Sequence, residues 1–153
     1  MKKILLTLSA LALSAAAVFA QHYEYKILTS VESIVPGGLG RSRLVENKGE
    51  INLSQLTTER ASGTDSKQNK VSRKDAKIDE LAETKMLNFY SLAGINFQNI
   101  ASNDAIIQTR MNELSREGWE LAFMASGVES DAGDKDGNGI FVTRFVFKRL
   151  SKN

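Results

Sequence analysis

The sequence predicts an α+β domain, in which an antiparallel sheet of about three or more strands carries a helix on one face. Three observations predict this class. Residues 22–28 alternate between apolar and polar side chains, a helical apolar stripe ends at Gly118, and two more alternating segments follow that helix. Strand, helix, strand and strand in this order (βαββ) place one helix over an antiparallel sheet.

Residues 1–20 are predicted to be a signal peptide outside the domain. Two lysines precede an uncharged apolar stretch, and Val18 and Ala20 supply the small side chains before a cleavage site near Ala20–Gln21. The stretch is shorter than the about 20 residues of a membrane span, and an uncleaved anchor is the alternative. We therefore expect a periplasmic or secreted protein with no membrane span after cleavage, formed by residues 21–153 as one domain.

Charge and cysteine content argue against several classes of function. The chain carries 20 Lys and Arg against 18 Asp and Glu. Two of the lysines lie in residues 1–20, so the remainder carries 18 charges of each sign. A neutral domain does not favour nucleic acid or anionic lipid. The chain has no cysteine, so stability must come from packing, a bound metal or a partner rather than from disulfides.

The first predicted strand spans residues 22–28. Tyr23, Tyr25 and Ile27 fall on one face and polar residues on the other, which is typical of a half-buried strand. We expect the aromatic residues at strand spacing to belong to the core rather than to a sugar-stacking platform.

Residues 29–102 are expected to form an insertion of loops and one helix. Pro36 and its neighbouring glycines indicate a turn, and a short hairpin is expected to turn at residues 47–49. Residues 57–74 are polar and are expected to form a mobile connection. A helix is predicted next, because apolar residues recur at spacings of three and four. These residues are Ile78, Ala82, Met86, Phe89 and Ala93.

A second helix is predicted to begin at Asn103, whose side chain can accept from the free amides of the first turn. Its apolar stripe consists of Ile107, Met111 and Leu114. Gly118 supplies the left-handed residue that ends a helix, and Trp119 is placed to pack back on Leu114. The helix therefore leads directly into a strand.

Two strands follow this helix, joined by a long acidic connection at residues 127–139. The first begins at Trp119 and alternates. The last, residues 140–149, has apolar side chains on both faces, which indicates a strand that is covered on both sides or that forms an interface.

Three short stretches resemble a small protein family, domain of unknown function 4177. They are YEYKIL in the first strand, MNELSREGWEL at the end of the second helix, and FVFKR in the last strand. The similarity covers residues 22–28 and about 103–150, and it implies the βαββ fold with a Gly-Trp-Glu-Leu junction. Residues 29–102 depart from the family pattern as a long insertion. The resemblance implies no established reaction and no catalytic residue.

The stretch DKDGNG resembles the start of a calcium-binding loop, with Asp134, Asp136 and Asn138 at the first, third and fifth positions. The twelfth position is Phe145, where a bidentate Glu belongs, and a β-patterned segment follows instead of a helix. We interpret the stretch as a hairpin connection. The alternative is a weak Ca²⁺ site in the acidic loop 129–138.

The stretch PGGLGRSR places two guanidinium groups, Arg41 and Arg43, beside glycine amides that can hold an anion. Arg43 stands where the third glycine of a dinucleotide fingerprint belongs, and no βαβ unit surrounds it. An ordinary turn is favoured over anion binding.

Few residues are suited to catalysis. His22 is the only histidine, so neither a zinc site nor a Ser-His-Asp system has its usual groups. We expect no enzymatic activity and no required cofactor. An unrecognised hydrolase would need His22 in a cleft beside an acid.

The expected function is therefore that of an exported, non-enzymatic module of the cell envelope. It would bind a protein partner or an envelope ligand through a sheet face, a sheet edge or the loop 127–139. A homo-oligomer is compatible with this interpretation.

Overall fold

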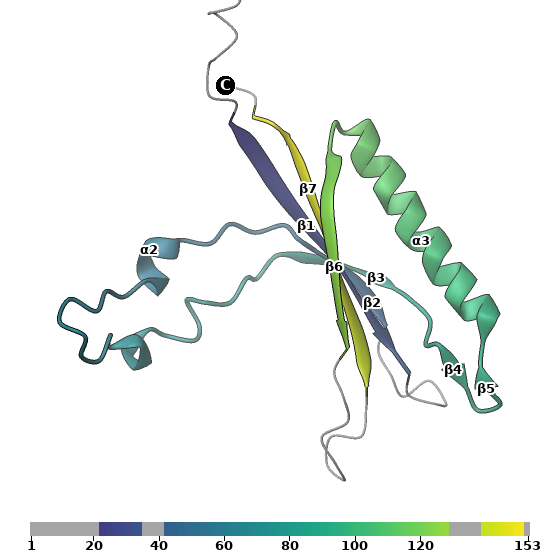
Figure 1. The fold of residues 1–153 in the computed structure, drawn as a ribbon, viewed down its shortest axis with the longest axis horizontal. Coiled ribbons are helices and arrows are strands. Elements are labelled where there is room, and N and C mark those ends of the chain that lie inside the picture. Colours follow the sequence, from purple (N-terminus) through teal and green to yellow (C-terminus); the bar gives the residue numbers. More distant parts are fainter. Residues whose placement is uncertain (1–21, 35–41, 129–138, 152–153) are drawn as a thin grey trace, which may run out of the picture.

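The structure, a computed structural model, describes residues 22–34, 42–128 and 139–151 and confirms the α+β class. Five strands form one sheet in the order β3-β2-β1-β7-β6, and each neighbouring pair is antiparallel. Helix α3 lies along one face of this sheet (Figure 1). The strands are β1 (Tyr23–Ser33), β2 (Arg43–Asn47), β3 (Leu81–Lys85), β6 (Glu120–Val128) and β7 (Ile140–Leu150).

Strands β1 and β7 form the centre of the sheet and pair along their whole length. The register runs from Tyr23 opposite Leu150 to Ser33 opposite Ile140. The predicted first and last strands are therefore confirmed, although β1 continues five residues beyond the predicted end at Leu28. Antiparallel pairing of β6 with β7 also means that the acidic connection joins two adjacent strands.

The helix covers the face of the sheet opposite to the one that the alternation indicated. Leu28 is buried beneath α3, while Tyr25 and Ile27 are 66% and 50% exposed. The expectation that Tyr23 and Tyr25 belong to the core is therefore wrong. Alternation shows which residues share a face, but it does not show which face a distant helix will cover. The buried apolar cluster is Leu28, Leu44, Met86, Leu114, Trp119, Phe145 and Phe147.

Helix α3 (Phe97–Arg116) ends as predicted but begins earlier. Gly118 has φ +85°, and the Trp119 amide donates to the Leu114 carbonyl at 2.9 Å, which is the bond that closes this type of helix end. The N-cap is Asn96, whose side chain accepts from the Asn99 amide. Asn103, the predicted cap, lies inside the helix. No helix in the described ranges combines the length and apolar character needed to cross a bilayer.

The prediction of a helix at residues 78–93 is wrong. This segment contains β3 and β4 (Tyr90–Ser91), and β4 pairs with β5 (Gly94–Ile95) in a short hairpin. Leu81–Lys85 pairs with β2, and the Met86 amide donates to the Ser42 carbonyl at 3.1 Å. Hydrogen bonding to a strand about 40 positions earlier thus overrides the local helical spacing.

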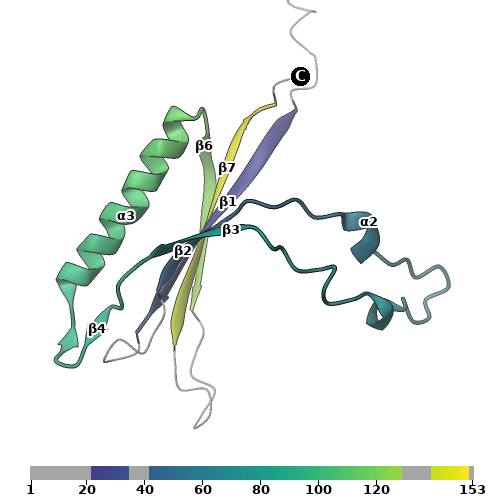
Figure 2. The same ribbon diagram turned by 180° about the vertical axis from the view of Figure 1, so that it is seen from behind.

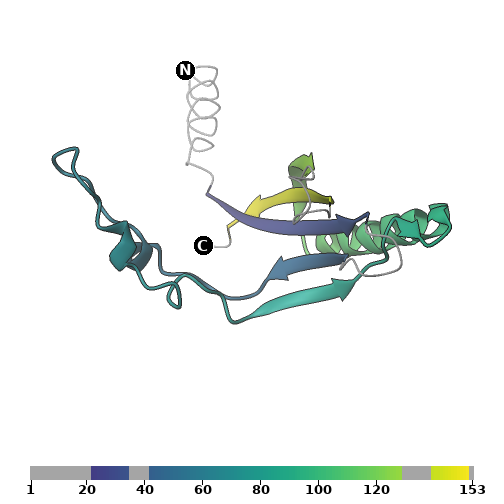
Figure 3. The ribbon, with the colours of Figure 1, turned by 90° about the horizontal axis from the view of Figure 1, so that it is seen from below.

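Residues 48–80 form an arm that extends beyond β2 and β3, away from α3 (Figures 2 and 3). The predicted hairpin at residues 47–49 does not form. Instead the amides of Lys48 and Gly49 both donate to the Glu80 carbonyl, at 3.0 and 3.1 Å, and close the base of the arm. The arm holds one turn of helix, α2 (Leu53–Leu56), and a 3-10 turn, η2 (Gln68–Lys70).

Candidate interaction surface

A buried charge cluster attaches α3 to the sheet near its C-terminal end. Glu46 of β2 is 5% exposed and accepts from Lys26 at 2.7 Å, Lys48 at 2.9 Å and Arg110 at 2.8 Å. Burial alone would raise the pKa of the Glu46 carboxyl, but the hydrogen bonds from these three cations lower it to about 2. Arg110 also forms an ion pair with Glu113 at 2.9 Å, so the charged groups of this cluster are paired with one another.

A second polar network attaches the N-terminal half of α3. Asn103 is fully buried, and its Oδ1 accepts from the Leu87 amide at 2.8 Å while its Nδ2 donates to the Leu87 carbonyl at 2.7 Å. Nδ2 also donates to Glu32 Oε1 at 3.0 Å. Burial and the nearby Asp104 carboxylate raise the pKa of Glu32, although the bond from Asn103 opposes this. Both networks hold the helix in place.

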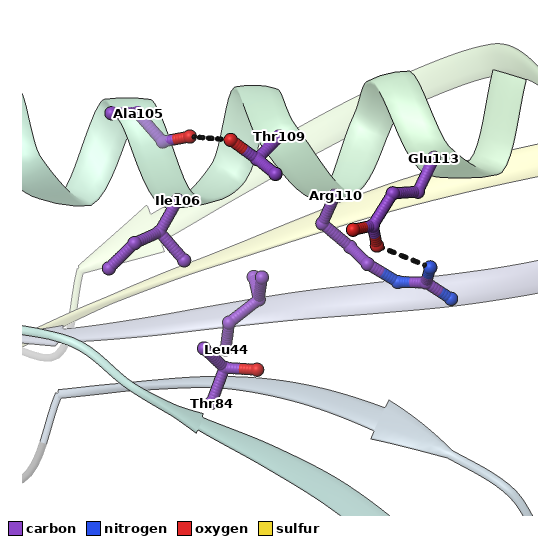
Figure 4. Close-up of a pocket in the computed structure, with 7 residues that line it drawn as sticks. All are labelled: Leu44, Thr84, Ala105, Ile106, Thr109, Arg110 and Glu113. Carbon is purple, nitrogen blue, oxygen red and sulfur yellow. Dashed lines mark hydrogen bonds and ion pairs between the residues drawn. The ribbon is translucent and has the colours of Figure 1, made fainter.

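Two shallow grooves flank α3. Figure 4 shows the groove of about 370 Å³ over β2 and β3, where Ile106 of the helix points toward Leu44 and Thr84. The groove over β6 and β7 has about 440 Å³, and its lining includes Met111, Met124 and Phe145. The helix is thus too narrow to cover the outer strands on its own face of the sheet.

The face of the sheet opposite α3 carries an apolar strip that remains exposed. The register places Phe123, Val146 and Ile27 in one row across β6, β7 and β1. Phe123 is 59% exposed, a large fraction for an aromatic side chain at a strand centre. We call this surface the open face. Its apolar residues are Tyr25, Ile27, Val31, Phe123, Val142 and Val146. The exposed Arg144 of β7 lies on the same face between Val142 and Val146.

Charged side chains border the open face. On the β6 side Lys148 lies 3.9 Å from Glu120, and its ammonium lies 5.3 Å from the Tyr23 ring centre. On the β3 side Glu83 and Lys85 stand opposite β2. An apolar centre with a polar border is the usual anatomy of a protein–protein interface.

Strand β6 is an edge of the sheet, and all nine of its residues are exposed. Its sequence, ELAFMASGV, contains one charge, Glu120, at its first position. A register shift between Leu121 and Phe123 interrupts its pairing with β7. The other edge, β3, has five residues and includes Glu83 and Lys85. The two edges therefore differ in how well they resist pairing with another chain.

Most of the sequence-predicted site residues lie outside the described residues, namely Arg41, Asp134, Asp136 and Asn138. Arg43 is described, and its guanidinium donates to the Ser42 carbonyl at 2.8 Å from strand β2 rather than from a turn. The interpretation of Arg43 as part of a glycine-rich turn is therefore wrong.

Phe145 and His22 lie in different environments. Phe145, at the twelfth position of the calcium pattern, is buried beneath α3. His22 is exposed at the start of β1, where its carbonyl accepts from the Ser151 amide at 2.8 Å. Within the described ranges, no group of three or more His, Cys, Asp or Glu residues is arranged to hold a metal ion.

Sequence reasoning missed the Glu46 cluster, the Asn103 network and the exposed side of β1. Glu46 and Arg110 lie 64 positions apart, and no local pattern connects them. A signal for the β6 edge was present, because ELAFMASGV combines nearly unbroken small and apolar residues with a single charge.

In comparisons with protein-family models, curated proteins and solved structures, nothing matched this chain. The resemblance to domain of unknown function 4177 thus stays a prediction.

Proposed function

We propose that this protein is a non-enzymatic interaction module of the cell envelope, which binds the apolar surface of a protein partner through the open face and the adjoining β6 edge. One observation carries this proposal. The row Phe123–Val146–Ile27 crosses three strands, and its two outer members, Phe123 and Ile27, are 59% and 50% exposed.

The exposure of this row favours a partner on energetic grounds. Burying apolar surface contributes roughly 25 cal/mol per Å², so an exposed apolar strip offers binding free energy that the isolated domain does not use. Contiguous apolar patches on the surface of a protein mark interaction sites more often than scattered apolar residues do. On the open face, Tyr25, Ile27, Val146 and Phe123 form such a patch, and Arg144 of β7 separates it from Val31 and Val142 on the same face.

The open face is also held rigidly. Tyr25 and Ile27 lie on β1 and pair with Lys148 and Val146 of β7, within a ladder that runs the whole length of both strands. A partner that binds this surface therefore does not have to order the backbone, which lowers the entropic cost of association.

Polar groups that are already engaged in structural hydrogen bonds support a role without catalysis. The carboxylate of Glu46 and the amide of Asn103 are occupied by structural hydrogen bonds. A general acid or base needs a titrating group that can reach a substrate. The described polar networks instead attach α3 to the sheet.

Site-specific photo-crosslinking in cells tests this proposal. A photoreactive phenylalanine analogue is placed at Ile27 on the open face and, as a matched control, at Ser115 on the exposed surface of α3. We expect a discrete adduct from Ile27 that disappears when Phe123→Glu is added, and none from Ser115. Equal adducts from both positions, or none from Ile27, would show that the open face is not the binding surface.

A further inference from the structure

We propose that the partner at the β6 edge is a second copy of this chain, whose β6 pairs antiparallel with the first around a two-fold axis near Ala125. This inference rests on the proposed function and names the partner of one part of that surface. The two five-stranded sheets would join into one continuous sheet, with an α3 helix on the same face of each half.

The contrast between the two edges supports pairing through β6 rather than β3. Edge strands resist pairing when they are short or carry charged side chains. Strand β3 has both features, with five residues that include Glu83 and Lys85. Strand β6 has nine residues, no proline and no lysine or arginine. Among the described residues, its pairing with β7 is interrupted by the register shift near Leu121, which lies at one end of the strand.

The central residues of β6 are complementary to themselves in this arrangement. A two-fold axis at Ala125 places Phe123 opposite Gly127 of the second copy and Met124 opposite Ser126. Each large side chain thus meets a small one, and an aromatic residue across from a strand glycine is a stabilising pair.

In this pairing, the open faces of the two copies lie on the same side of the joined sheet. Phe123 and Gly127 stand opposite Val146 and Val142 of β7, so both belong to the open face. Met124 stands opposite Phe145, which is buried beneath α3. Residues directly opposite in an antiparallel pair share a face, so the open faces of the two copies become one continuous surface.

The charge distribution permits this pairing. Glu120 is the only charged residue of β6, and it lies five positions from Ala125. The two Glu120 carboxylates therefore lie at opposite ends of the shared edge, and no charged residues of the two β6 strands face each other across it. Met124, 63% exposed beside the 440 Å³ groove, gains a neighbour from the second copy.

The absence of cysteine makes a direct test possible. In residues 21–153, Ala125→Cys places one thiol beside the same thiol of the second copy, since opposite Cα atoms in a sheet lie about 4.5–5.5 Å apart and a disulfide spans that distance. Glu83→Cys, exposed on the β3 edge, is the matched control. We expect mild oxidation to link Ala125→Cys into a covalent dimer at least tenfold faster than Glu83→Cys. Equal rates would overturn the pairing.

Sedimentation of the unmodified domain provides the second readout. We expect a dimer that Ala125→Lys converts to a monomer with an unchanged circular dichroism spectrum, while Thr84→Lys on β3 leaves the dimer intact. A monomer at all concentrations up to the millimolar range would overturn the inference. In that case a crosslink from Ile27 to a different protein would still support the proposed function, so the two failures are distinguishable.

Discussion

Arg110 of α3 and Glu46 of β2 form a bidentate ion pair across the interface between helix and sheet. Arg110 Nε donates to Glu46 Oε2 at 3.0 Å, and Nη2 donates to Oε1 at 3.0 Å. Because Glu46 is buried among Lys26, Lys48 and Arg110, the pair sets the position of the helix along the sheet as well as contributing energy.

Arg110→Met should destabilise the domain by about 2 kcal/mol. Removing one member of a buried ion pair costs about 3–5 kcal/mol when the other charge is left alone, and here two lysines still neutralise Glu46. Urea denaturation of residues 21–153 measures the change. Arg116→Met, on the exposed side of the same helix, is the control and should cost less than about 0.5 kcal/mol. Equal losses for both variants would contradict a special role for Arg110.

Stability should decrease in acid partly through Glu46. Its folded-state pKa of about 2 lies below the unfolded value of about 4.3. The stabilisation is therefore fully present above about pH 4 and is lost as the pH falls toward 2. It amounts to on the order of 3 kcal/mol.

The free energy of unfolding between pH 5 and 2 measures this effect. Glu46→Gln should flatten the profile, whereas Glu59→Gln, in the exposed part of the arm, should not. A profile of Glu46→Gln as steep as that of the unmodified domain would assign the acid sensitivity to other carboxyl groups.

Asn103→Ala should cost about 2–3 kcal/mol, because the amide and carbonyl of Leu87 would lose the partners that the fully buried Asn103 side chain supplies. Thermal denaturation followed by circular dichroism measures the loss. Asn112→Ala, exposed on the same helix, should change stability little. If the Asn103 variant were equally stable, water would have to satisfy both Leu87 groups.

Gly118→Ala should destabilise the domain by about 1 kcal/mol through the backbone alone. Gly118 has φ +85°, and a Cβ added there would meet no atom within 4 Å. The cost therefore arises from the left-handed conformation rather than from a clash. Guanidinium denaturation detects it, with the exposed helix substitution Ser115→Ala as reference. A neutral Gly118→Ala would indicate that the helix end relaxes to another conformation.

Calcium at millimolar concentration should leave the melting temperature unchanged, because the sequence of loop 129–138 leads to Phe145 instead of a bidentate Glu. Differential scanning calorimetry with and without CaCl₂ measures the shift. A rise that Asp134→Asn and Asp136→Asn abolish would instead establish a calcium site in this loop.

The sequence correctly predicted the elements whose conformation depends on residues close together in the chain. The end of α3 is such an element, because Leu114, Gly118 and Trp119 form the closing contacts within six residues. The start of α3 was missed because Asn96 and Asn103 are both good caps, and only the burial of Asn103 against Leu87 distinguishes them.

By itself, the sequence determined the α+β class, the strands β1 and β7, and the end of α3, since each depends on a local periodicity or a left-handed glycine. Only the tertiary structure decided that β2 and β3 extend the sheet, that Glu46 meets Arg110, and that Ile27 is exposed. The pairing of β2 with β3 and the contact of Glu46 with Arg110 join segments more than 30 positions apart. The physical reason is that alternation separates residues onto two faces of a strand without showing which face is buried. Only the packing of α3 against one face decides this.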